Sequence, residues 1–275
     1  MKSFKRRMAI AAGAVAAAGV GAWLYERLDP NTYARFKTMF GPARVYQVED
    51  DAGRAVRLLE VGDIVQSGTY VDDDLRYELA FEYLKRYNAM FDPAGAGLAD
   101  WEVRPIHTVL VLGCGGYDYP EYLIAHHPEV SVVAVEVDPA ITDIARRYFH
   151  LDRCIEEFET EQNGRLIMVC ADARAFLDQA AQEGCTWDAI VNDTFDAGSP
   201  VLSLTTLEAA HTIRACLNPG GVYLTNVVSA LEGVHGRFLR QQVTTLGGAF
   251  DAVGVLTCDP DSLTEPDNVI VVARA

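Results

Sequence analysis

The sequence lacks the cysteine and histidine patterns that hold disulfide-rich or zinc-binding folds together. Its 275 residues contain six cysteines, with no C-x-x-C pair and no histidine at zinc-ligand spacing. This distribution argues against a disulfide framework and indicates a reducing compartment. We therefore predict that the protein holds no metal. The six cysteines are Cys114, Cys154, Cys170, Cys185, Cys216 and Cys258.

Positive charge is scarce beyond the first 44 residues. The chain carries 23 Lys and Arg against 39 Asp and Glu, a formal net charge of −16. Residues 1–44 hold eight of the basic and two of the acidic side chains, which leaves 15 against 37, a net of −22, on the rest. Such a body repels a phosphate backbone, so we predict no nucleic-acid partner. The acid excess favours a small cationic or neutral partner, or only keeps the protein in solution.

A long, strongly apolar run is also missing. Residues 1–28 form a basic, Ala/Gly-rich segment in which four Lys and Arg precede an uncharged run over residues 8–24. That run lies at the short end of the roughly 17 to 25 residues that span a bilayer. A cleaved signal, a membrane anchor and a surface helix all fit this layout. The unpaired cysteines favour a cytoplasmic body, and residues 8–24 are the candidate for a membrane contact that would tether it.

Residues 43–92 are predicted to form a small β-rich cap. Three apolar runs are separated by turn-prone Asp and Gly residues, which is typical of an antiparallel sheet. A helical period of apolar residues follows over 73–91, and the Pro/Gly/Ala-rich stretch 92–100 is the predicted linker to the next domain. The three runs are 43–48, 55–61 and 64–71.

Residues 104–275 alternate between strand-like and helix-like segments. Alternation at this spacing predicts parallel strands joined by crossover helices, an α/β fold. The seven strand-like runs are 108–112, 131–137, 166–170, 189–192, 222–227, 252–257 and 269–272. The helix-like segments are 120–127, 139–149, 173–182, 204–217 and 234–246.

A glycine turn follows the first of these strands. The run 108–112 leads directly into Gly113, Cys114, Gly115 and Gly116. A bound nucleotide needs close backbone approach at this strand end, and only glycine leaves the space open. Glu136 ends the next strand 23 residues after Gly113, where a carboxylate can accept both ribose hydroxyls. Together the two features predict a nucleoside site, although a glycine turn alone also closes ordinary loops.

Two further strand ends carry carboxylates. Asp172 and Ala173 follow the third strand, where the carboxylate either meets an adenine amino group or caps the next helix. Asp193 and Asp196 follow the fourth strand, three residues apart. Ligands of such sheets bind outside the carboxyl ends of the strands, so we predict Asp193 and Asp196 as the catalytic pair. The alternative is that both only cap the following turn.

These segments resemble the spermidine synthase family, the polyamine aminopropyltransferases, over roughly residues 43–275. The family's glycine turn and E-[IV]-D-P segment are similar to VLVLGCGGYDYPEYLIAHHPEVSVVAVEVDPAITDIARRYF. Its adenine-side motif is similar to CADARAFL, and its D-[ST]-x-D motif to Asp193-Thr194-Phe195-Asp196. The resemblance implies a Rossmann-like S-adenosylmethionine-dependent methyltransferase fold with a seven-stranded, mostly parallel sheet. It also implies a homodimer or homotetramer, with Asp193 as the base.

The cap carries a further likeness, and with it come departures from the family pattern. VGDIVQSGTYVDDDLRYEL resembles the family's cap motif, which implies that Gln66 and Tyr77 hold the amine substrate. Glu78, where the family usually has His or Gln, is a predicted second anchor. The synthase glycine turn continues with an aspartate for the cofactor amine, whereas this chain has Gly116, with Asp118 two residues on. The predicted cofactor-binding residues are Gly113, Gly115, Gly116, Asp118, Glu136, Asp172 and Ala173.

The predicted function is a spermidine synthase-like transfer of an aminopropyl group from decarboxylated S-adenosylmethionine to a polyamine such as putrescine. Paired carboxylates suit this reaction because they attract a protonated amine and can take its proton. Two alternatives stay open. The first is a methyltransferase that uses intact S-adenosylmethionine, although residues 192–195 lack both prolines of the N-P-P-[YF] motif. The second is a non-catalytic nucleoside-binding homologue.

Overall fold

The computed structural model describes residues 32–98, 101, 104–196 and 199–275. The predicted N-terminal segment 1–28 lies outside this part of the chain, so the membrane contact of residues 8–24 stays a prediction. In the described residues, no helix has the length and apolar character needed to cross a membrane.

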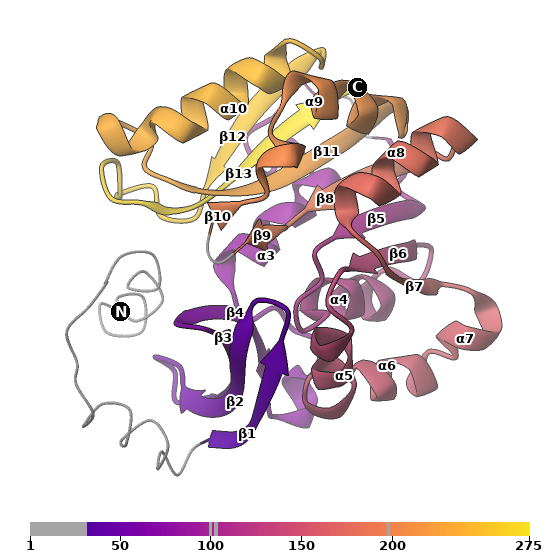
Figure 1. Ribbon diagram of the computed structural model, residues 1–275, viewed down its shortest axis with the longest axis vertical. Coiled ribbons are helices and arrows are strands. Elements are labelled where there is room, and N and C mark those ends of the chain that lie inside the picture. Colours follow the sequence, from indigo (N-terminus) through magenta and orange to yellow (C-terminus); the bar gives the residue numbers. More distant parts are fainter. Residues whose placement is uncertain (1–31, 99–100, 102–103, 197–198) are drawn as a thin grey trace.

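The cap is a four-stranded antiparallel sheet in the order β1-β2-β3-β4 (Figure 1). Three of its strands were predicted, but the first was missed and the sheet begins before residue 43. The missed strand alternates exposed Tyr, Arg and Lys with half-buried side chains and has no fully buried residue, so it contains no apolar run to detect. The strands are β1 (Thr32–Thr38), β2 (Gly41–Glu49), β3 (Ala55–Val61) and β4 (Ile64–Tyr70).

The single helix predicted over 73–91 is wrong. The chain instead forms η2 (Asp73–Leu75), α3 (Glu82–Arg86) and η3 (Tyr87–Met90), with extended backbone at Phe81. Leu79 makes an isolated antiparallel bridge with Thr69 of β4. Leu79 and Phe81 are both buried. Side chains two residues apart lie on the same face of an extended chain but on different faces of a helix. The packing of this pair in the core therefore favours extended backbone over the helix that the apolar pattern predicts.

The body is a seven-stranded, mostly parallel sheet, as the resemblance implied, and its strand order is β12-β13-β11-β8-β5-β6-β7. Six strands run in one direction, and β13 alone runs antiparallel, pairing with β11 on one side and β12 on the other. Because β5 pairs with β6 on one side and β8 on the other, the strand order reverses there. The strands are β5 (Thr108–Leu112), β6 (Ser131–Glu136), β7 (Leu166–Cys170), β8 (Trp187–Asn192), β11 (Leu217–Ser229), β12 (Ala252–Thr257) and β13 (Asp267–Arg274).

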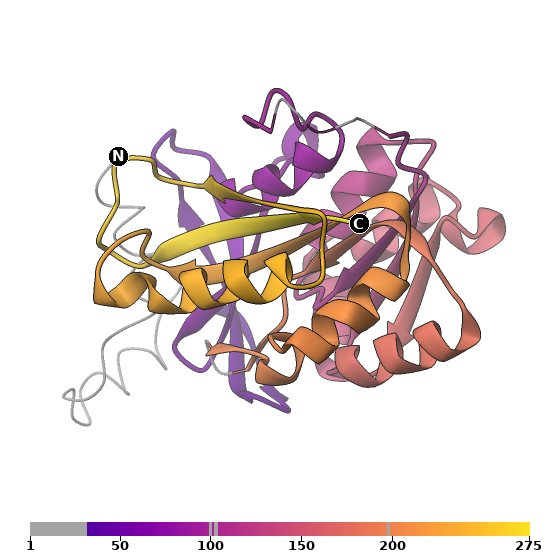
Figure 2. The same ribbon diagram turned by 90° about the horizontal axis from the view of Figure 1, so that it is seen from above.

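Helices cover both faces of this sheet (Figure 2). Val109 and Val111 of β5 belong to the core shared by the cap and α4–α6, whereas Leu110 and Leu112 belong to the core under α8–α10. Burial on two faces explains why the strands read as continuous apolar runs. The helices are α4 (Asp118–His126), α5 (Pro139–Tyr148), α6 (Leu151–Glu157), α7 (Thr160–Asn163), α8 (Ala173–Glu183), α9 (Leu207–Ala215) and α10 (Arg237–Gly247); α6 and α7 were not predicted. Short elements complete the body: β9 (Phe195–Asp196), β10 (Ser199–Pro200), η4 (Leu202–Leu204) and η5 (Val234–Gly236).

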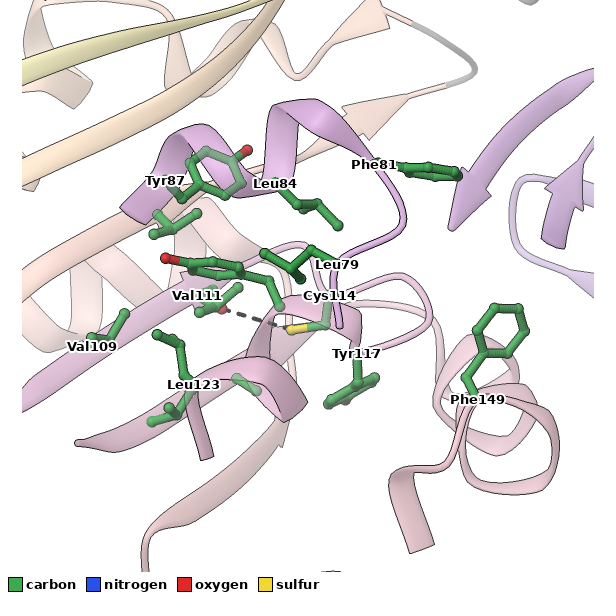
Figure 3. Packing of buried hydrophobic residues seen from close by; sticks show 14 of the residues in the cluster. Leu79, Phe81, Leu84, Tyr87, Val109, Val111, Cys114, Tyr117, Leu123 and Phe149 are labelled. Atoms are coloured by element: carbon green, nitrogen blue, oxygen red, sulfur yellow. Dashed lines mark hydrogen bonds between the residues drawn. The ribbon is translucent and has the colours of Figure 1, made fainter. Parts of the chain in front are cut away.

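The cap shares a hydrophobic core with the body at the carboxyl end of β5. Leu84 and Tyr87 of the cap lie over Val111 and the glycine turn at Cys114 (Figure 3). Tyr87 is fully buried, and the Cys114 thiol contacts the carbonyl oxygen of Val111. This shared core holds the cap segments next to the strand ends where the sequence predicted a site.

Candidate functional site

A cavity of about 160 Å³ lies between the cap and the carboxyl ends of β5, β8 and β11. Its charged side chains are three carboxylates, Asp118, Asp193 and Asp267, and no Lys, Arg or His of the described chain lines it. The other polar and aromatic side chains in its wall are Gln66, Ser67, Phe81, Tyr83, Tyr87, Tyr119, Phe195, Asn226 and Asn268. An acidic space of this kind favours a cationic ligand.

The glycine turn forms one wall of the cavity, as predicted. Gly113 has a φ of +76° and Gly115 a φ of +50°, a backbone region that glycine adopts without strain. A side-chain carbon at Gly113 would lie 2.6 Å from the carbonyl oxygen of Asp193. The turn therefore requires glycine, because the loop after β8 packs directly against its backbone.

Gly116 is enclosed by the cap and by the end of α5. Its amide donates to the hydroxyl of Ser67 in β4 at 2.6 Å, and a side-chain carbon there would lie 2.7 Å from the ring of Phe149. Gly116 does not line the cavity. A carboxylate side chain has no room at this position, which explains why the chain lacks one there.

Asp118, at the start of α4, points a carboxylate into the cavity instead. Its Oδ2 accepts from the amide of Gly68 at 3.3 Å, while Oδ1 is buried and has no hydrogen-bond partner in the described chain. Burial raises the pKa of Asp118 to about 7, although the amide of Gly68 and the hydroxyl of Ser67 act to lower it. An enclosed carboxyl oxygen without a partner is suited to receive an N–H donor from a ligand.

Asp193 follows β8 and lies in the same cavity. Its Oδ2 accepts from the hydroxyl of Tyr83 at 3.0 Å, and its Oδ1 from the side-chain amide of Asn226 at 2.9 Å. Burial raises the pKa of Asp193 to about 6, and these two hydrogen bonds limit the increase. A carboxylate with a pKa close to neutral is suited to accept a proton from a substrate.

The turn that carries Asp193 is held by the buried amide of Asn192. This side chain donates to the hydroxyl of Tyr223 at 2.8 Å and accepts from the hydroxyl of Thr194 at 2.8 Å. Asp196, the predicted catalytic partner, lies in β9, and its side chain falls outside the described part of the chain. Its role stays a prediction.

The predicted ribose ligand, Glu136, is buried beside the glycine turn but does not line the cavity. Its Oε2 accepts from the amides of Cys114 and Gly115 at 3.0 and 3.3 Å, and its Oε1 from the amide of Asp138 at 3.0 Å. Burial raises the pKa of Glu136, while these amides act to lower it. The carboxylate therefore closes onto the backbone of the turn in this structure.

Asp172 and Ala173 lie at the start of α8, directly after β7. Asp172 accepts from the amide of Ala175 at 2.9 Å as the N-cap of the helix. This is the capping alternative that the sequence left open. Neither residue lines the cavity, so contact with an adenine stays a prediction.

The cap delivers Gln66 to the cavity but not Tyr77 or Glu78. The hydroxyl of Tyr77 donates to Glu157 at 3.0 Å, and the carboxylate of Glu78 lies 3.5 Å from His126. Neither side chain therefore reaches the cavity in this structure, and their contact with an amine stays a prediction.

Several residues of the site, Asp267, Tyr83 and Asn226 among them, were not singled out from the sequence. Tyr83 was read only as part of a helical apolar stripe, and Asn226 only as part of a strand. The sequence could have pointed to Asn226, because it is the single amide side chain in the mostly apolar stretch VYLTNVV, and a buried polar residue in a strand needs an explanation. In the described residues, no group of three or more His, Cys, Asp or Glu could hold a metal ion.

Comparison with protein families gives a match to the spermine/spermidine synthase domain over residues 102–258. The polyamine aminopropyltransferase of Vibrio vulnificus is 28% identical over 211 residues, which cover 73% of this chain and 64% of that protein. An eEF1A lysine and N-terminal methyltransferase homolog of Drosophila melanogaster is 25% identical over 223 residues, 74% of this chain and 32% of that protein. The chain thus spans just under a third of the second relative and just under two thirds of the first.

Solved structures share the fold. A probable spermidine synthase from Corynebacterium glutamicum gives a TM-score of 0.66 at 20% identity, covering 88% of this chain and 79% of the other. A spermidine synthase in complex with the transition state analogue AdoDATO gives a TM-score of 0.62 at 15% identity, covering 89% and 73%. At these identities the similarity concerns the fold, including the Rossmann-like sheet and the cap.

Proposed function

The chain belongs to the spermine/spermidine synthase domain family, and from that premise we propose that it transfers an aminopropyl group from decarboxylated S-adenosylmethionine to a small polyamine such as putrescine. The observation that carries the proposal is the acidic cavity at the strand-order reversal. Its three carboxylates match a ligand set of positive charges, namely a protonated amine and a sulfonium cofactor that bears an ammonium group.

The same cavity disfavours intact S-adenosylmethionine as the donor. Intact cofactor would bring its own carboxylate next to Asp118 and Asp193, and the described cavity wall offers no basic side chain to neutralise it. Like charges that are partly buried repel more strongly than charges in water, because solvent screening is reduced. The decarboxylated form removes that repulsion and leaves its ammonium group to pair with a carboxylate.

Asp193 supplies the proton acceptor in this proposal. The amine nitrogen attacks the methylene carbon beside the sulfonium sulfur, so a C–N bond forms as the C–S bond breaks and methylthioadenosine leaves as a neutral thioether. The proton lost by the nitrogen passes to Asp193, whose pKa of about 6 keeps it largely ionised and able to accept near neutral pH. Holding donor and acceptor in line provides most of the acceleration.

Glu136 remains the proposed ribose ligand, with Asp172 at the adenine. The similarity to a synthase solved with AdoDATO supports a bound S-adenosyl group. Both Glu136 oxygens now accept backbone amides, so nucleoside binding requires that the carboxylate share these bonds with the ribose hydroxyls or exchange them. The proposed assembly is a homodimer or homotetramer, which light scattering on a size-exclusion column measures directly.

The experiment is a product analysis by mass spectrometry. The purified full chain is incubated with putrescine and either decarboxylated or intact S-adenosylmethionine, with Asp193→Asn as the control variant. We expect aminopropylated putrescine and methylthioadenosine from the decarboxylated donor alone, and a large loss of product in the control. Product from the intact donor alone, or none from either, would contradict the proposal.

Methyl transfer is the second candidate, supported by the similarity to the Drosophila melanogaster methyltransferase homolog. It predicts a methylated amine and S-adenosylhomocysteine from the intact donor in the same assay. A chain that binds methylthioadenosine in a calorimetric titration but forms neither product would be a non-catalytic homologue.

A further inference from the structure

Asn226 in β11 has an unusual hydrogen-bonding state. The residue is 5% exposed, and its side-chain Nδ2 donates to Asp193 Oδ1 at 2.9 Å. Its side-chain Oδ1 is buried and has no hydrogen-bond partner in the described chain. An unpaired buried amide oxygen is destabilising, so its persistence calls for an explanation.

The orientation of this amide is fixed by its neighbour. A carboxylate only accepts hydrogen bonds, so the NH2 end of the Asn226 amide must face Asp193 and the carbonyl end must face elsewhere. Asn226 and Val228 both line the cavity, as alternate residues of one strand face do. Thr225 and Val227 face the opposite side of the sheet, where Thr225 contacts Asn192 and Val227 belongs to the core under α8–α10.

Resting on the proposed aminopropyl transfer, we infer that Asn226 positions the attacking nitrogen by accepting one of its N–H groups at Oδ1. A primary amine about to attack has two N–H groups and one lone pair. With one N–H directed to Asp193 and the other to Asn226, the lone pair is directed to the methylene carbon of the donor. Asn226 thereby contacts the base, Asp193, through its Nδ2 and the attacking amine through its Oδ1.

This arrangement also determines which amines react. A secondary amine about to attack has only one N–H group, so it must leave Asn226 Oδ1 unpaired. Sites built to receive an N–H group discriminate against ligands that lack it. The cavity is therefore specific for primary amines. N,N′-dimethylputrescine, which has a secondary amine at each end, should be a poor substrate compared with putrescine.

Two variants separate the two ends of the amide. Asn226→Leu removes both the donor and the acceptor at similar volume, and we expect the preference in kcat/KM for putrescine over N,N′-dimethylputrescine to fall by about tenfold. Asn226→Asp keeps an acceptor but loses the donor to Asp193. It should retain the preference for putrescine, while the acid limb of its kcat/KM profile moves up by about one pH unit because the pKa of Asp193 rises.

Each outcome decides a different claim. An active wild type whose preference for putrescine is unchanged in Asn226→Leu overturns this inference alone. A wild type that converts no amine overturns the proposed function and the inference with it. Thermal unfolding identifies a variant that fails to fold. In that event Asn226→Asp alone decides: this variant keeps an acceptor for the second N–H group of the amine, so a loss of its preference for putrescine overturns the inference.

Discussion

Replacing Asp118 by Asn should stabilise the fold at alkaline pH, although the change removes a predicted ligand. Asp118 has a folded pKa of about 7 against an ordinary value of 3.8, because its carboxyl is buried. The folded protein therefore binds this proton more tightly than the unfolded chain. The sign follows from linkage: the contribution of Asp118 to stability is complete below pH 3.8 and is lost as the pH rises to about 7.

The size of the effect follows from the same shift. Linkage at about 1.4 kcal/mol per pKa unit gives a change of about 2 kcal/mol in the unfolding free energy between roughly pH 5.5 and 8. Asp118 as a residue is only half-buried, although its Oδ1 is enclosed, so solvent near the carboxyl reduces this to about 1 kcal/mol. The Asn variant carries no such pH dependence.

Urea unfolding of the wild type and Asp118→Asn at both pH values measures this difference. We expect the variant to gain about 1 to 2 kcal/mol relative to the wild type on going from the lower to the higher pH. Glu161→Gln, at an exposed position, is the control and should show no such change. An equal stability difference at both pH values would refute the reasoning, because it would place the Asp118 pKa near its ordinary value.

Further variants test the cap and the glycine turn. Tyr83→Phe removes a hydrogen bond to Asp193, so the pKa of this base should rise, and we expect the acid limb of kcat/KM to move to higher pH with roughly a tenfold loss of activity. Tyr77→Phe should leave kcat/KM unchanged, since this hydroxyl contacts Glu157 outside the cavity; equal losses in the two variants would contradict the structure. Gly116→Ala should lower the unfolding free energy by about 1 to 3 kcal/mol through overpacking, whereas Gly247→Ala, with open space around it, should not lower it.

Much of the body could be predicted because local chemistry determines it. The apolar run of β5 ends at a turn where backbone packing admits only glycine, and Asp193 comes at the end of the neighbouring strand. Both facts depend on strand order and residue type alone, so the sequence places them correctly at one edge of the sheet. Capping of α8 by Asp172 was also recognised as an alternative for the same reason.

The cap could not be predicted to the same depth because tertiary contacts determine its path. Phe81 packs against Gly68, whose missing side chain leaves room for the ring, and the backbone at Phe81 is extended and not helical. The break changes which tyrosine reaches the cavity, so Tyr83 rather than Tyr77 contacts Asp193. A periodicity argument cannot detect this change, since it treats residues 73–91 as one helix and so cannot say where the side chains on either side of a break will lie.

The contact between Gly113 and the carbonyl of Asp193 has a consequence for how this protein can change over time. The glycine turn and the loop after β8 pack against each other through their backbones. No side chain lies between them that could change its conformation if one loop moved. A mutation that moves one loop displaces the other, so neither half of the site can drift alone. Diversification toward new substrates is therefore expected in the cap, where exchangeable side chains such as Gln66 form the wall.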